Sequence, residues 1–95
     1  MDTTELLAAP LPGADLVAKG LDDLQQGRET IEALLVAIGR PRLRRLGFDV
    51  PARYDDPELR LYERLAAEDP DAAHSRYNAL VRRLVRFERS AECAR

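Results

Sequence analysis

The longest helical pattern in the chain lies in residues 70–93, which read PDAAHSRYNALVRRLVRFERSAEC. Pro70 followed by an acid is a helix-start signal, and no further Pro or Gly interrupts the stretch. Apolar residues recur with spacings of four and three, the heptad pattern of a helix that packs along one seam. We therefore predict a long amphipathic C-terminal helix. Its seam consists of Ala73, Tyr77, Leu80, Leu84, Phe87, Ala91 and Ala94.

Pro and Gly divide the rest of the chain into shorter helical segments. At 95 residues the chain has room for one domain, residues 1–95. We predict an all-α fold, a small bundle of about five helices. Residues 1–12 form an N-terminal arm. Because this arm lies at the end of the chain, it is a candidate for flexibility. The segments expected to be helical before the C-terminal helix are residues 3–9, 14–26, 29–38, 41–46 and 57–68.

The composition supports a helical fold. Fifteen Leu and fourteen Ala stand against five Val and two Ile, so good helix formers far outnumber the β-branched residues that strands prefer. In the helix expected at 14–26, the apolar stripe leaves Asp22 and Asp23 on another face. The helix expected at 57–68 packs through Leu59, Tyr62, Leu65 and Ala66.

Charge and cysteine content exclude several classes of protein. The net charge of −2 gives no general attraction to nucleic acid or to an anionic membrane. The longest apolar run, Ala33 to Ile38, is far too short to span a bilayer, and the acidic N-terminus is unlike a signal peptide. A single cysteine, Cys93, allows no intrachain disulfide. We expect a cytoplasmic protein without membrane contact, and the preference for Arg over Lys indicates a G+C-rich, bacterial genome.

The candidate catalytic groups do not form a known constellation. Asp71 and His74 share the spacing of a metal-ligand pair, but a di-iron site needs two such pairs and the chain has one His. His74 and Ser75 are adjacent on a helix, where their side chains diverge by about 100°. The five glycines are isolated and form no phosphate loop. The sequence therefore predicts that the protein is not an enzyme and carries no metal or cofactor.

Four arginines surround Pro41: Arg40, Arg42, Arg44 and Arg45, here called the Arg corner. With the helix before it, the Arg corner has the outline of a helix-turn-helix, and Arg40, Arg42 and Arg45 are its candidate contacts to nucleic acid or to an acidic partner. The second helix, about 9 Å long, is short for a recognition helix. The other interpretation is a solvated corner whose arginines pair with the acidic second and third helices.

The C-terminal helix, about 36 Å long, is about as long as the whole domain is wide. We expect its last turns, with Phe87 and Ala91, to lack a cover within the chain and to pair with a second molecule, parallel or antiparallel. The alternative is that the whole seam packs within one chain. Arg83 and Glu88 would then pair across a parallel dimer. The predicted interface is Tyr77, Leu80, Leu84, Phe87 and Ala91.

The function predicted from these patterns is a non-catalytic interaction or regulatory module. It would act as a homodimer or as an adaptor for a larger protein. The alternative is a small helix-turn-helix-like DNA-binding protein that uses the Arg corner.

Overall fold

A computed structural model describes residues 2–94 of the chain. These residues form six helices and no strand, which confirms the predicted all-α bundle with a long C-terminal helix. The helices are α1 (Thr3–Ala8), α2 (Ala14–Gln25), α3 (Ile31–Ile38), α4 (Arg40–Arg45), α5 (Pro57–Glu68) and α6 (Ala73–Ala94).

Side-chain caps set the helix starts. The Thr30 hydroxyl accepts a hydrogen bond from the backbone N–H of Ala33 at 3.1 Å, so α3 begins at Ile31 and not at the expected residue 29. The Asp56 carboxylate caps α5 in the same way, and Pro57 takes the first helical position as predicted. Local chemistry therefore fixes these boundaries.

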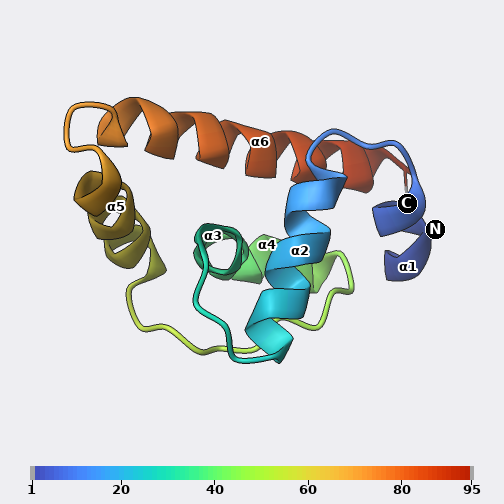
Figure 1. The fold of residues 1–95 in the computed structure, drawn as a ribbon. Coiled ribbons are helices and arrows are strands. Elements are labelled where there is room, and N and C mark those ends of the chain that lie inside the picture. Colours follow the sequence, from blue (N-terminus) through green and yellow to red (C-terminus); the bar gives the residue numbers. More distant parts are fainter. Residues whose placement is uncertain (1, 95) are drawn as a thin grey trace.

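Helix α6 lies along one side of the molecule, and the other helices pack beneath it (Figure 1). Helix α5 lies under its first turns, α3 crosses beneath its middle, and α2 lies under its later turns. The molecule measures 39 × 24 × 18 Å, so α6 spans most of its longest dimension.

Helices α2 and α3 have the most extensive contact among the described helices, and their backbones come close together at Gly20. A Cβ atom at this position would collide with the carbonyl oxygen of Glu32 and a methyl group of Val36. The two backbones can approach this closely only because residue 20 has no side chain. Gly20 therefore determines how tightly α3 packs on α2.

The last turns of α6 are covered within the chain, contrary to the prediction. Phe87 and Ala91 are fully buried. The Phe87 ring packs against Phe48, with ring centroids 5.9 Å apart, and Gly13 lies directly against the Phe87 Cβ. The expectation that these turns need a second molecule is wrong, because the loops before α2 and after α4 cover them.

The first helix is docked on the rest of the molecule. Helix α1 packs on α2, and its Leu6 is fully buried in the common core. Asp2 caps α1 by accepting a hydrogen bond from the backbone N–H of Glu5. The segment predicted as an N-terminal arm thus contributes to the core, although Met1 lies outside the described residues.

Helix α5 packs through the predicted face only in part. Leu65 is buried and Ala66 packs against the core, as predicted. Leu61 and Leu65 are fully buried, whereas Leu59 is 52% exposed and Tyr62 is 38% exposed. The Tyr62 ring lies at the edge of the contact with α6, 5.9 Å from the ring of Tyr77. The buried stripe runs along the side of α5 that meets α3 and α6, so Leu59 lies outside it.

In the part of the chain that the structure describes, no helix combines the length and the apolar character needed to cross a membrane.

Candidate functional site

Two carboxylates are buried within residues 2–94: Asp23 on α2 and Glu88 on α6. Each residue exposes no more than 3% of its surface. A buried charge is costly unless hydrogen bonds or ion pairs replace the lost water, so the partners of each carboxylate show its role.

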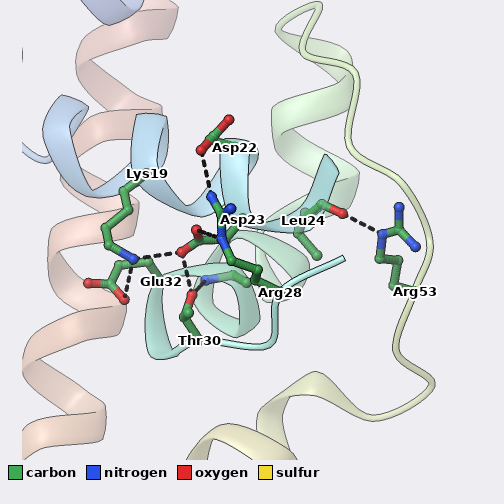
Figure 2. Close-up of polar contacts among 9 residues, drawn as sticks. Lys19, Asp22, Asp23, Leu24, Arg28, Thr30, Glu32 and Arg53 are labelled. Atoms are coloured by element: carbon green, nitrogen blue, oxygen red, sulfur yellow. Dashed lines mark hydrogen bonds and ion pairs between the residues drawn. The ribbon is translucent and has the colours of Figure 1, made fainter. Parts of the chain in front are cut away.

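Asp23 accepts three hydrogen bonds (Figure 2). The Lys19 ammonium donates at 2.7 Å, the Thr30 hydroxyl at 2.6 Å and the Arg28 Nε at 3.0 Å. These four residues are here called the Asp23 cluster. The prediction that Asp23 points away from the packed face is wrong, because the loop after α2 folds back and encloses its carboxylate.

The Asp23 cluster joins three consecutive segments. Lys19 and Asp23 belong to α2, Arg28 to the loop, and Thr30 to the cap of α3. The hydrogen bonds from Lys19, Thr30 and Arg28 hold the pKa of Asp23 far below its ordinary value. The carboxylate is therefore ionised and fully partnered, which is the arrangement of a structural ion pair.

Peripheral contacts extend the Asp23 cluster (Figure 2). Arg28 also pairs with Asp22 at 2.8 Å, and Lys19 lies 3.6 Å from Glu32 of α3. On the other side of α2, Arg53 donates a hydrogen bond to the backbone carbonyl of Leu24. The polar groups at this end of the molecule satisfy one another.

Glu88 has a different environment. Its side chain is only 4% exposed, yet it accepts no hydrogen bond from any residue between 2 and 94. The nearest cationic nitrogen, Nη1 of Arg42, lies 3.8 Å away. Arg42 donates its hydrogen bonds to Glu92 instead, at 2.6 Å and 3.1 Å. Burial raises the pKa of Glu88 despite the opposing charges of Arg42 and Arg45.

The Glu88 carboxylate borders a cavity of about 220 Å³ between α3, α4 and α6, here called the Glu88 groove. A Cβ atom at Gly39 would lie 3.1 Å from one Glu88 oxygen, so the α3–α4 turn rests directly on the carboxylate. The walls are mostly apolar, and two arginines of the Arg corner, Arg42 and Arg45, also line the cavity. Its lining residues are Ile38, Gly39, Pro41, Arg42, Arg45, Val81, Leu84, Val85 and Glu88.

Two arginines of the Arg corner, Arg40 and Arg42, form hydrogen bonds with other segments of the chain. Arg40 donates from Nε to the backbone carbonyl of Val50 at 2.8 Å, and Arg42 forms the bidentate pair with Glu92. The expectation that these arginines pair with the second and third helices is wrong for Arg42, whose partners lie on α6 because α4 packs beside its C-terminal half. Arg45 lines the same surface as Glu92.

The predicted seam of α6 divides into two parts. Leu84, Phe87 and Ala91 are buried in the chain's own core, whereas Tyr77 and Leu80 are half-buried. The predicted pairing of Arg83 and Glu88 across a parallel dimer stays a prediction. Within the chain Arg83 lies 3.5 Å from Asp15, and Glu88 lies beside Arg42 of α4.

The groups considered for catalysis stay apart. His74 Nε2 lies 3.2 Å from the Asn78 amide, and Cys93 is exposed. Within the described residues, no three His, Cys, Asp or Glu side chains gather in a group that could hold a metal ion. The chain matches no protein-family model, no curated protein and no solved structure.

Glu88 is the site residue that the sequence reasoning missed. A signal was present, because Glu88 follows Val81 by seven positions and Leu84 by four, which places a charge on an apolar helix face.

Proposed function

We propose that the chain is a non-catalytic interaction module that binds a second copy of itself. The observation that carries the proposal is the outer face of α5. Leu59 and Tyr62 are the most exposed large apolar side chains in the described part of the molecule. Exposed Glu58 and Glu63 flank them, and neither forms an ion pair within residues 2–94.

A complementary surface lies on α6. Arg82, Arg86 and Arg89, here called the Arg ridge, follow one exposed face of this helix. None of the three forms a hydrogen bond or an ion pair with another described residue. The charges of these two surfaces are complementary. One copy would present the acidic and apolar face of α5, and the other copy would present the unpaired basic face of α6. This match supports self-association through the C-terminal helix, with α5 as its counterpart.

Light scattering behind a sizing column tests the proposal. At tens of micromolar the mass is expected to exceed the 10.7 kDa of one chain. Leu59→Asp places a charge in the apolar centre of the contact and should return the mass to that of a monomer. Arg64→Asp, on a different exposed side of α5, is the matched control and should leave the assembly intact. A monomeric wild-type chain would refute the proposal.

The DNA-binding alternative keeps one supporting observation. Arg44 and the Arg ridge are exposed and have no partner among residues 2–94. A salt titration of duplex DNA binding tests it, since phosphate contacts weaken steeply as salt rises. Replacing Arg82 and Arg86 with Gln should then reduce both the affinity and the salt slope. Both proposals are compatible with the cytoplasmic location expected from the sequence.

A further inference from the structure

The Glu88 carboxylate accepts no hydrogen bond from residues 2–94, although its side chain is only 4% exposed. No fully enclosed side-chain oxygen of the described residues lacks a hydrogen-bond partner, so the Glu88 oxygens keep a small contact with solvent. Arg42 pairs with Glu88 only at 3.8 Å, because its Nε and Nη2 donate to Glu92. The carboxylate borders a cavity, so a group entering the cavity can replace this solvent and donate a hydrogen bond to Glu88.

The size of the cavity limits what can enter. Pockets for drug-sized ligands measure about 300–1,000 Å³. The Glu88 groove, at about 220 Å³, is smaller and suits a single large side chain. Val81, Val85 and Ile38 form apolar walls that would contact the body of such a side chain.

The charged residues around the cavity determine which kind of hydrogen-bond donor can approach Glu88. Arg42 and Arg45 line it beside Glu88, so an entering ammonium or guanidinium group would meet like charge. A neutral O–H donor on an apolar ring avoids this repulsion. Tyrosine has this combination of an apolar ring and a hydroxyl donor.

The chain itself displays such a tyrosine. Tyr62 is 38% exposed on α5, and its hydroxyl makes no hydrogen bond to any described residue. Glu58 and Glu63 flank it, and their charges match the neighbouring Arg ridge. We propose that Tyr62 of a second copy inserts its ring into the Glu88 groove and donates its hydroxyl proton in a hydrogen bond to Glu88.

This inference rests on the proposed self-association and names its central contact. The decisive variant is Tyr62→Phe, which keeps the ring and removes only the hydroxyl. Sedimentation equilibrium should show self-association weakened by roughly tenfold or more, the usual effect of losing a hydrogen bond to a charged group. Tyr77→Phe, which removes the hydroxyl from the neighbouring ring, should leave the dissociation constant unchanged.

A second pair of variants tests the groove from the other side. Val85→Phe fills the cavity and should abolish self-association, whereas Ala79→Phe, exposed on α6 outside the groove, should have little effect. In a Glu88→Leu background, Tyr62→Phe should cause no further loss, because its partner is already absent. Circular dichroism must show each variant folded. If Glu88→Leu does not fold, the Tyr62→Phe and Val85→Phe results decide alone.

The outcomes separate this inference from the proposed function. If the chain self-associates and Tyr62→Phe or Val85→Phe leaves the dissociation constant unchanged, the contact with Glu88 is wrong and self-association stands. If the wild-type chain is a monomer at every concentration, both fail. A mixture of Val85→Phe and Tyr62→Phe chains should associate more tightly than Val85→Phe chains alone, because the first retains the tyrosine and the second retains an open groove.

Discussion

The Asp23 cluster and the Glu88 groove each contain one buried carboxylate, but the two carboxylates differ in the hydrogen bonds that they accept. Asp23 accepts hydrogen bonds from three donors, all within seven residues of it in the sequence. Glu88 accepts none from the described residues, and its nearest cation belongs to a distant helix. Burial alone therefore does not show what a charged residue does. The donors around it distinguish a residue that stabilises the fold from one that is available to a partner.

The difference has an energetic basis. A charged acceptor whose hydrogen bonds are all made contributes to stability, whereas a carboxylate that loses most of its hydration and gains only a 3.8 Å ion pair contributes little or carries a cost. In the isolated chain Asp23 should stabilise the native state, while Glu88 should add little or oppose it. A partner that supplied a donor to Glu88 would convert this cost into binding energy.

The largest effect is expected from Asp23→Ala. This change leaves Lys19, Arg28 and Thr30 without their common acceptor and separates the end of α2 from the start of α3. The melting temperature, followed by circular dichroism, should fall by roughly 10 °C. Asp22→Ala is the control, since Asp22 is exposed and pairs only with Arg28. If the two changes lowered the melting temperature equally, Asp23 would not be the residue that stabilises this part of the fold.

The protonation of Asp23 should make the free energy of unfolding depend on pH. Its pKa is lowered on folding, so its contribution is fully present above the unfolded-state pKa and is lost as the pH falls through and below that value. The wild-type chain should therefore lose stability below about pH 4. Asp23→Asn should be less stable at pH 7 but lose less of its stability on acidification. Urea unfolding between pH 7 and pH 2 measures both.

Glu88→Gln should change the stability in the opposite direction from Asp23→Asn at pH 7. Because burial raises the pKa of Glu88, the protonated form favours folding, and this contribution disappears as the pH rises through the folded-state pKa. At pH 7 the variant should be as stable as the wild type or more stable by up to about 1 kcal/mol. The advantage should vanish in acid. A clear loss of stability at pH 7 would show that Glu88 is a structural carboxylate like Asp23.

The smallest effects are expected at the Arg corner. Arg42→Gln removes the bidentate pair with Glu92, which lies on the surface, and should lower stability by about 0.5 kcal/mol. Arg45→Gln should change it by no more than a similar amount. Urea unfolding at low and high salt checks this, since an exposed ion pair is screened at high salt. A larger loss at Arg42 would mean that its 3.8 Å contact with Glu88 stabilises the fold.

The fold was largely predictable because helix boundaries depend on nearby residues. The prediction for α5 matches at both ends, since Asp56 and Pro57 define its start within the sequence itself. The cover of Phe87 was not predictable. Gly13 and Phe48, which provide it, are far away in the sequence and carry no pattern that connects them to α6.

The candidate site was predictable only in part. Arg42 and Arg45 were selected as contact residues, and both line the Glu88 groove. Glu88 itself was assigned to the flank of an exposed seam, because periodicity shows which residues share a face but not what covers that face. Asp23 was misplaced for the same reason, since its partner Arg28 lies in a loop without periodicity.

The close contact of α2 and α3 at Gly20 also bears on the order in which the chain folds. The loop between these helices is short, and the Asp23 cluster closes it with local contacts, so little chain entropy is lost when the pair forms. We expect this pair of helices to be structured in the folding transition state and the packing of Phe48 on Phe87 to come later. Val36→Ala should then slow folding, whereas Phe48→Leu should mainly accelerate unfolding, as stopped-flow kinetics can measure.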